Sequence, residues 1–404
     1  MQTFIYDAVM KKTIYLDNAS TTPVRPEVIS AMKPCWGQNF GNPSSITKMG
    51  VLAKQAIEKA RQTVAEVLMR RPNEIIFTSG GTESNNLAIL GLVKSLEKSG
   101  QKISDLHFIT TNVEHSSITE CFKDLENRGA KVDYLKVKEN GIVDPSDLRK
   151  LIKPNTVLVS IGYANNEIGT IQPIRELAKE IRHARKNNKI SDEFPLFHTD
   201  ASQAGLWLDL NVNQLGVDLM TLDAQKMNGP KGIAVLFVRA GVNLSPIILG
   251  GGQEKSLRSG TENVPLIVGL AKTFELARKN LAKKNEKVKK VRDYFWQKIQ
   301  KEIPEAILNG DLENRLPNNL NISIKDINSE FLVLGLDEEG IVCSTKSSCE
   351  RDAEESFVVR ALGGAEWRAR TSLRFSLSED VTKKDIDFIL KKFYTIYYGY
   401  GKTH

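Results

Sequence analysis

The stretch of residues 195–232 contains the clearest signals of the fold in this sequence. Its first part reads Pro195-Leu196-Phe197-His198-Thr199-Asp200-Ala201-Ser202-Gln203, and its second part reads Asp223-Ala224-Gln225-Lys226-Met227-Asn228-Gly229-Pro230-Lys231-Gly232. Residues 196–200 and 219–223 are short apolar runs typical of buried strands. Asp200 ends the first run, and Lys226 follows the second. The stretch therefore places a carboxylate and a lysine at the ends of two neighbouring predicted strands.

The sequence around this stretch alternates between apolar runs and amphipathic helices. Helices are predicted at residues 52–69, 83–98, 116–128 and 174–186. Strands are predicted at residues 74–78, 106–111, 131–135, 157–161, 196–200, 219–223 and 233–238. Strands that alternate with helices indicate an α/β fold, in which a mostly parallel sheet carries helices on both faces.

The pattern changes after about residue 264. Helices rich in lysine and glutamate are predicted at residues 264–282 and 285–302, and they precede strands at 319–324 and 372–376 and helices at 329–336 and 383–398. This order is typical of a smaller α+β domain. We expect a large domain over residues 24–280 and a small domain formed by residues 1–23 together with residues 281–404.

Length and composition describe an ordinary globular chain. It has 404 residues, 41% of them hydrophobic, which suffices for a large core and two or three domain-like units. The net charge of +7 comes from 56 basic and 49 acidic residues that mix along predicted helices, so no direct contact with nucleic acid is expected. No apolar run suits a membrane helix or a secretory signal, so we expect no membrane contact and a cytoplasmic location.

The four cysteines are too few and too scattered for a disulfide framework, and without a CxxC pair no metal site is expected. Cys343 follows an apolar run and is expected to pack in the core. Cys349 ends the polar stretch that begins at Ser344, where a structural cysteine is unusual. The nearby Lys346 and Arg351 favour its thiolate, whereas the surrounding acidic residues oppose it.

Asp200 and Lys226 are the pair that a pyridoxal 5'-phosphate (PLP) enzyme requires. The lysine forms a Schiff base with the cofactor, and the carboxylate keeps the pyridine nitrogen protonated so that the ring can accept electrons. Taken singly, the aspartate could cap a turn and the lysine could be one of many surface lysines. The prediction of a PLP site therefore depends on the other polar motifs that follow predicted strands.

Three further motifs follow other predicted strands. Ser79-Gly80-Gly81-Thr82 opens a predicted helix, a place that favours phosphate, although glycines also start ordinary helices. His115 follows the strand at 106–111, and Asn165-Asn166 follows the strand at 157–161. Ligands of α/β sheets bind at the C-terminal ends of the strands, so these residues, together with Asp200 and Lys226, predict one site.

The ordered motifs resemble those of the cysteine desulfurases of the NifS/IscS-like group, which are PLP-dependent fold-type-I enzymes of the class-V aminotransferase family. The resemblance covers nearly the whole chain and implies a large domain with a mostly parallel seven-stranded sheet and a smaller α+β domain. It rests on Ile14–Pro23, Gly41–Ser45, Gly80–Asn86, Glu114-His115, Asn165–Gly169, Asp200–Gln203, Lys226–Gly232, Arg258–Thr261 and Arg374–Leu377.

The resemblance also implies a role for each site residue. Lys226 is the Schiff-base lysine, Asp200 pairs with the ring nitrogen, and His115 stacks on the ring and belongs to the catalytic set. The other implied contacts are Asn166 and Gln203 at the ring-oxygen side, Gly81 and Thr82 at the phosphate, Thr261 at the phosphate from the partner subunit, and Arg374 and Asn42 at the substrate. Cys349 is the implied nucleophile.

The implied reaction converts L-cysteine to L-alanine and leaves the sulfur as a persulfide on Cys349, for iron–sulfur cluster assembly or tRNA thiolation. The implied partners are a second copy of the chain in a homodimer and a sulfur-acceptor protein. One alternative is a PLP-dependent lyase that acts on selenocysteine or cysteine sulfinate, although a required cysteine nucleophile argues for cysteine. The other is a catalytically degenerate relative that serves as a binding or scaffold protein.

Asp223 and Gln225 depart from the family pattern, which more usually has Ser or Thr and His at these cofactor-phosphate positions. Two unit negative charges ~4 Å apart at an effective dielectric of ~20 repel by roughly 4 kcal/mol. Either Asp223 turns away, or a cation or shared proton intervenes, or PLP binding is weakened. Lys346 in place of a glycine and Thr47 in place of a histidine are lesser departures.

Overall fold

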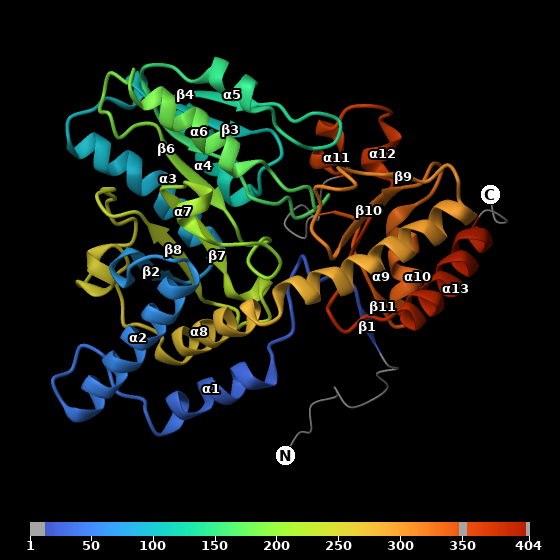
Figure 1. Ribbon diagram of the computed structural model, residues 1–404, viewed down its shortest axis with the longest axis horizontal. Coiled ribbons are helices and arrows are strands. Elements are labelled where there is room, and N and C mark those ends of the chain that lie inside the picture. The colour runs from blue at the N-terminus through green and yellow to red at the C-terminus, as the bar shows by residue number, and fades with distance from the viewer. Residues whose placement is uncertain (1–12, 347–353, 401–404) are drawn as a thin grey trace.

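The computed structural model describes residues 13–346 and 354–400, and a seven-stranded sheet is its largest feature (Figure 1). β8 pairs antiparallel with β2 and β7, and the remaining pairs are parallel. This arrangement confirms the predicted mostly parallel sheet. The strands in spatial order are β2 (Ile75–Thr78), β8 (Ala234–Val238), β7 (Leu219–Asp223), β6 (Leu196–Asp200), β5 (Thr156–Ser160), β3 (His107–Thr111) and β4 (Lys131–Leu135).

Helices cover both faces of this sheet because successive strand residues point to opposite sides. Ile76 and Phe108 pack in an apolar cluster with α3 and α4, whereas their neighbours Phe77 and Ile109 pack in a second cluster on the other face. The first layer contains α3 (Gly81–Lys98) and α4 (Ser116–Asn127), and the second contains α1 (Pro26–Gly37), α2 (Lys48–Val67), α5 (Pro145–Leu151), α6 (Ile174–Arg185), α7 (Val212–Leu215) and α8 (Val264–Arg278).

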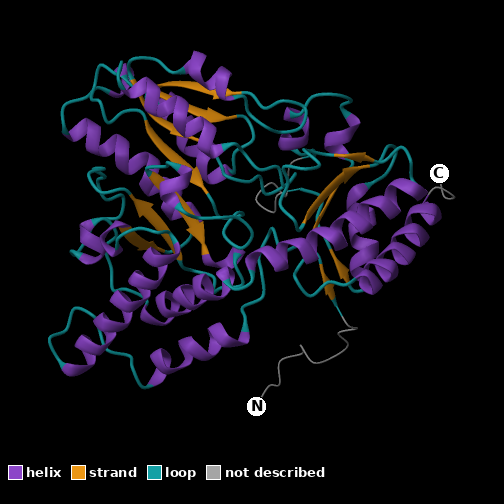
Figure 2. Ribbon diagram, viewed as in Figure 1, coloured by secondary structure: helices purple, strands orange, loops and turns teal. Residues whose placement is uncertain are grey.

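The N-terminal segment joins the C-terminal third of the chain in a smaller α+β part. β1 (Ile14–Tyr15) pairs parallel with β11 (Ile341–Val342). Figure 2 shows the antiparallel sheet of this part apart from the larger sheet, with helices outside it. Its elements are β9 (Ile307–Leu308), β10 (Asn319–Ser323), β12 (Ser372–Ser376), α9 (Leu281–Glu302), α10 (Ser329–Glu338), α11 (Phe357–Ala361), α12 (Trp367–Arg370) and α13 (Lys383–Tyr400). The division into domains over residues 24–280 and over residues 1–23 with 281–404 stays a prediction.

A cluster of aromatic rings fixes β12 in this part. Phe375 of β12 lies 5.0 Å from Phe295 of α9 and 6.4 Å from Phe393 of α13, measured between ring centroids. All three rings are fully buried and meet edge to face, a favoured arrangement. Because side chains alternate along a strand, anchoring Phe375 toward the helices turns the preceding Arg374 to the opposite face of β12.

Several helix ends differ from the predictions. The helix predicted at residues 264–282 ends at Arg278, because Lys279 is extended and Asn280 has a left-handed backbone with φ of 54°. The prediction also missed α1 and α5. Both begin with a proline, and α1 contains a second one, Pro34, so their short patterns resembled loops.

The described part of the chain contains no helix that is both long and apolar enough to cross a membrane. Within residues 13–346 and 354–400, no group of three or more His, Cys, Asp or Glu side chains is arranged to hold a metal ion.

Candidate cofactor and active site

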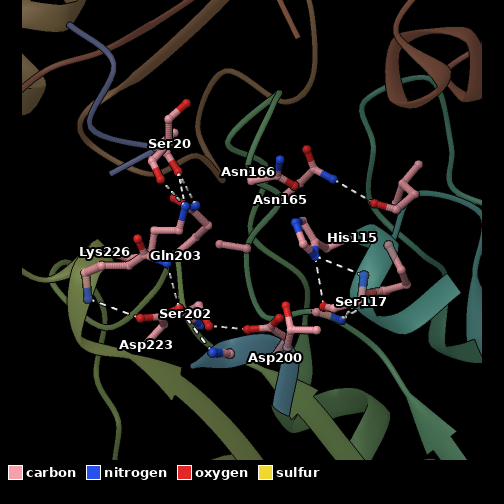
Figure 3. Close-up of a pocket in the computed structure, with 18 of the residues that line it drawn as sticks. Ser20, His115, Ser117, Asn165, Asn166, Asp200, Ser202, Gln203, Asp223 and Lys226 are labelled. Atoms are coloured by element: carbon pink, nitrogen blue, oxygen red, sulfur yellow. Dashed lines mark hydrogen bonds between the residues drawn. The ribbon is translucent and has the colours of Figure 1, made fainter. Parts of the chain in front are cut away.

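A cavity of about 240 Å³ lies at the C-terminal ends of the parallel strands and is closed by residues of the smaller part (Figure 3). Most residues that line the cavity come from the segments directly after β2, β3, β5, β6 and β7. Ser20 and Arg374 line the remaining side. Ten predicted site residues line it: Gly81, Thr82, His115, Asn166, Asp200, Gln203, Asp223, Gln225, Lys226 and Arg374. The structure thus brings into one cavity residues that are far apart in the sequence.

Lys226 reaches across this cavity toward the N-terminal segment. It ends the short 3-10 turn Ala224–Lys226 that follows β7. Its Nζ donates a hydrogen bond to the carbonyl oxygen of Ala19 at 2.8 Å and another to the carbonyl oxygen of Ser20. Gln203 anchors the same segment, because its Nε2 donates to the carbonyl oxygen of Ala19 at 2.9 Å. The amine is therefore held by neutral carbonyl groups inside the cavity.

Asp200, at the end of β6, is held by one donor on each carboxylate oxygen. Oδ1 accepts the backbone N–H of Ser202 at 2.9 Å, and Oδ2 accepts Nδ2 of Asn85 at 2.8 Å. Asn85 is fully buried in α3, and its Nδ2 also donates to Ser117 Oγ at 2.8 Å. A carboxylate has about four lone-pair sites, so Asp200 keeps acceptor capacity for a ligand in the cavity.

His115 forms the N-cap of α4, and its ring is fixed by Ser117. The backbone N–H of Ser117 donates to His115 Nδ1 at 3.1 Å, and Ser117 Oγ lies 2.8 Å from the same nitrogen (Figure 3). Because Nδ1 accepts a hydrogen bond, the proton of the neutral imidazole is assigned to Nε2. The ring thus has one defined tautomer and a fixed orientation at the cavity wall.

Glu114 is a buried carboxyl group next to this histidine. Its oxygens accept the backbone N–H of Gly162 at 3.0 and 3.1 Å and the hydroxyl of Thr111 at 2.7 Å. Burial raises the pKa of Glu114 to about 7, and the nearby negative charge of Asp200 adds to the rise. Sequence reasoning included Glu114 in a motif but gave it no role.

Arg374 lines the cavity from β12 and is only 1% exposed. One amino group donates to Asp17 Oδ1 and to Ser20 Oγ, both at 2.8 Å, and the other donates to the carbonyl oxygen of Asn166 at 3.1 Å. Its Nε has no hydrogen-bond partner among the described residues. A buried cation with an unused donor suits a ligand carboxylate.

Asp223 does not turn away from the cavity. Its Oδ2 accepts the backbone N–H of Gly81, the first residue of α3, and Nε2 of Gln225, both at 3.1 Å. Its Oδ1 accepts the backbone N–H of Gln225, also at 3.1 Å. The explanation that Asp223 turns away is therefore wrong. The three groups that donate to its carboxylate are amide N–H groups, which carry no charge.

Two predicted site residues do not line the cavity. Asn42 is exposed in the loop between α1 and α2, where its Oδ1 accepts the backbone N–H of Ser44 at 2.9 Å. Thr261 is exposed in the loop before α8. Nearby Thr47, which replaces a histidine of the family, is the N-cap of α2. The roles of Asn42 and Thr261 stay predictions.

Cys349 lies outside the described residues, and the other three cysteines are buried. Burial raises the pKa of the Cys343 thiol far above its usual range and that of Cys121 to about 12. Cys343 packs in the main apolar cluster, as expected. Cys35 is also buried and has a raised pKa.

The fold and the cavity together define a PLP-dependent enzyme of fold type I. The model of the aminotransferase class-V family matches residues 14–389. Cysteine desulfurase IscS of Dictyoglomus turgidum is 44% identical over 383 residues, which cover 94% of this chain and 93% of that protein. The IscS of Methanosarcina thermophila is 43% identical over 381 residues, or 94% and 91% of the two chains. The chain therefore belongs to the class-V aminotransferase family and, within it, to the cysteine desulfurases.

Solved structures agree with this assignment. A NifS-like protein superposes with a TM-score of 0.87 at 36% identity, over 95% of this chain and 99% of that one. SspA, solved in complex with cysteine, superposes with a TM-score of 0.76 at 35% identity, over 90% and 99% of the two chains. The comparisons confirm the predicted family, fold type and PLP dependence.

The residues present fit PLP at its reactive end. The Lys226 amine, the Asp200 carboxylate and the fixed ring of His115 all border one cavity. At the end where α3 begins, the donor set is less suited to a phosphate, because Asp223 already accepts the N–H of Gly81.

Proposed function

We propose that the protein is a PLP-dependent cysteine desulfurase, which converts L-cysteine to L-alanine and carries the sulfur as a persulfide on Cys349. The single observation that supports this most is that Lys226, Asp200 and Arg374 line the same cavity in a chain of this family. They supply an amine for the cofactor, a carboxylate for its ring nitrogen and a cation for an amino-acid carboxylate.

Each group acts through contacts that the structure supplies. PLP, when bound through Lys226, provides the electron sink that labilises bonds at the substrate Cα. Asn85 and the N–H of Ser202 orient the Asp200 carboxylate, which would hold a proton on the ring nitrogen of bound PLP. Asn166 and Gln203 are expected on the ring-oxygen side, and Thr82 is expected at the phosphate.

Arg374 is proposed to bind the substrate carboxylate. Asp17 and Ser20 fix its guanidinium by hydrogen bonds at 2.8 Å, so the cation is oriented before the substrate arrives. Such preorganisation lowers the entropic cost of binding. The unpaired Nε offers a donor that the protein itself leaves unused.

The chain connectivity supports Cys349 as the acceptor of sulfur. Ser344 pairs with Arg374 through two backbone hydrogen bonds of 3.1 and 2.6 Å. Only four residues lie between Ser344 and Cys349 in the sequence. Cys349 therefore follows closely in sequence on a residue that pairs with the proposed carboxylate-binding strand residue, and sulfur would pass to it by nucleophilic attack on the substrate sulfur, which breaks the substrate Cβ–S bond.

The partners and the location belong to the same proposal. We expect a homodimer, in which Thr261 reaches the phosphate site of the partner subunit, and a protein acceptor for the persulfide sulfur in iron–sulfur cluster assembly or tRNA thiolation. The cytoplasmic location is also expected.

The absorbance spectrum of the purified protein with PLP, followed by L-cysteine, tests the function. We expect a Schiff-base band near roughly 410–430 nm that is absent from Lys226→Ala. Alanine should form with wild type, and an added thiol reductant should release the persulfide sulfur as sulfide. Cys349→Ser should lose this activity while keeping the band. Alanine formation that does not need Cys349 would favour a lyase of the selenocysteine or cysteine sulfinate type. No band at saturating PLP would favour a non-catalytic binding protein.

A further inference from the structure

We infer that Asp223 makes this site a poor host for the phosphate dianion of PLP, so that the aldehyde and ring of the cofactor, rather than its phosphate, supply most of the binding free energy. The inference rests on the proposed function, because it concerns the cofactor of that site. It predicts that the protein discriminates weakly between PLP and pyridoxal, the same aldehyde without phosphate.

The N-terminus of α3 borders the cavity, at the end where the cofactor phosphate is expected. The leading N–H groups of a helix lack partners within the helix and attract anions. α3 has 18 residues, and its first residues, Gly81 and Thr82, line the cavity. The Gly81 N–H donates to Asp223 Oδ2 at 3.1 Å. A carboxylate of the protein therefore already uses a donor that a phosphate at this helix end would take.

Little space surrounds the contact between Gly81 and Asp223. A Cβ placed on Gly81 would lie 3.3 Å from Asp223 Oδ2 and 3.5 Å from Ser202 Oγ. The carboxylate thus packs directly against the helix end. Ser202 Oγ is buried and has no hydrogen-bond partner among the described residues. It is a neutral donor available to a ligand, but it brings no charge that could offset the carboxylate.

The negative charge of Asp223 is not offset by the polar groups around it. Gln225 directs both its backbone N–H and its Nε2 at Asp223, each at 3.1 Å, so its amide donor also serves the carboxylate. Glu83 in the first turn of α3 pairs with Arg258, whose Nε donates to Glu83 Oε1 at 3.1 Å. The Gln225 amide carries no charge, the charge of Arg258 is already paired with Glu83, and Asp223 forms no ion pair in the described part of the chain.

The size of the effect follows from Coulomb's law. Two unit charges ~4 Å apart at an effective dielectric of ~20 repel strongly enough to lower affinity by about a thousandfold if nothing compensates. Structural relaxation and water reduce this repulsion between the two negative charges in a protein site. We therefore expect Asp223→Asn, which keeps the shape and can still cap the turn, to tighten PLP binding by at least about tenfold.

The test measures dissociation constants of the full-length apoprotein for PLP and for pyridoxal, from the Schiff-base absorbance. Asp223→Asn should tighten PLP and leave pyridoxal within about twofold. Asp144→Asn is the matched control, since Asp144 is the N-cap carboxylate of α5 and does not line the cavity. It should leave both constants unchanged. Inorganic phosphate should compete with PLP more effectively in Asp223→Asn than in wild type.

A second variant keeps the test decisive if Asp223→Asn fails to fold. Gln225→His retains the cap and adds a cation at the same place when protonated, so it should tighten PLP and not pyridoxal. An unchanged ratio of the two constants in both variants would overturn the inference while leaving the proposed function intact. If neither aldehyde forms a band with wild type, the proposed function itself fails.

Discussion

The protonation state of Glu114, a buried carboxyl group of the site, depends on the fold. It is buried between the loop that carries His115 and the backbone of Gly162, and burial raises its pKa to about 7 from an ordinary value of 4.5. The role proposed for its neighbour Asp200, at the cofactor ring nitrogen, depends on a negative charge on that carboxylate. A protonated Glu114 would therefore avoid a second negative charge beside Asp200 near neutral pH.

This shift predicts a pH-dependent stability that Glu114→Gln should remove. The folded-state pKa is raised, so the stabilisation is complete below pH 4.5 and is lost as the pH rises through about 7. The loss amounts to roughly 3 kcal/mol at ~1.4 kcal/mol per pKa unit. Urea unfolding of the apoprotein at several pH values between these limits should show wild type losing stability relative to Glu114→Gln.

Glu120→Gln is the control for this prediction, because Glu120 is exposed on the neighbouring helix α4 and pairs with Lys123. Its stability should follow wild type at every pH. Parallel curves for wild type and Glu114→Gln would show that Glu114 is ionised in the folded protein throughout the range.

The sequence predicts best those site residues that end strands. Asp200 and Lys226 were found because apolar runs precede them, and the parallel sheet then brings such ends together. Asn85 and Glu114 were not assigned, because their roles depend on contacts with Asp200 and Gly162 from other elements. The direction of Asp223 could likewise not be predicted, since it depends on where α3 begins in space.

At the scale of elements, the turn Gln253–Ser256 is the most constrained local structure. Three successive non-glycine residues, Glu254, Lys255 and Ser256, have φ of 44°, 59° and 61°. Such backbones cost of order 1 kcal/mol or more each and need support from their surroundings. The support is Arg61 of α2, which donates to both oxygens of Glu254 at 2.8 and 2.7 Å in a buried pair.

Glu254→Gln should therefore destabilise the protein by about 3–5 kcal/mol, because it leaves the buried Arg61 without its main counter-charge. Glu58→Gln removes the other carboxylate of the same arginine, which lies 3.2 Å away and is 54% exposed, and should cost no more than about 1 kcal/mol. Thermal and urea unfolding measure both values. Equal losses from the two variants would contradict the proposed support of the turn.

The elements themselves were largely predictable. Strands at 131–135, 196–200, 219–223 and 372–376 have the predicted bounds, because each contains two or more apolar side chains in alternating or consecutive positions. Helix ends were less accurate, since a single backbone conformation, such as that of Asn280, decides them. The left-handed turn at Glu254 was not predictable, because its residues are not glycines and a distant arginine holds it.

At the scale of the whole molecule, large apolar side chains are exposed along the end of α1, the following loop and the start of α2. The exposed fractions are 62% for Trp36, 69% for Phe40, 97% for Ile46 and 56% for Leu52. Exposed apolar patches of this kind mark protein interfaces. In the proposed homodimer, we expect a second copy of the chain to cover these exposed side chains.

Size-exclusion chromatography with light scattering should therefore give about twice the chain mass of 45.1 kDa for the full-length protein. Phe40→Asp combined with Ile46→Asp should shift the protein toward the monomer, because two charges would be buried without partners in the interface. Leu334→Asp is the matched control, since Leu334 of α10 is also exposed, at 66%, but lies in the smaller part. A wild-type monomer at micromolar concentration would refute the homodimer.

A dimer that persists in the double variant would show that the interface lies elsewhere on the protein. Retention of PLP by a monomeric variant would show that PLP binding does not need Thr261 from a partner subunit.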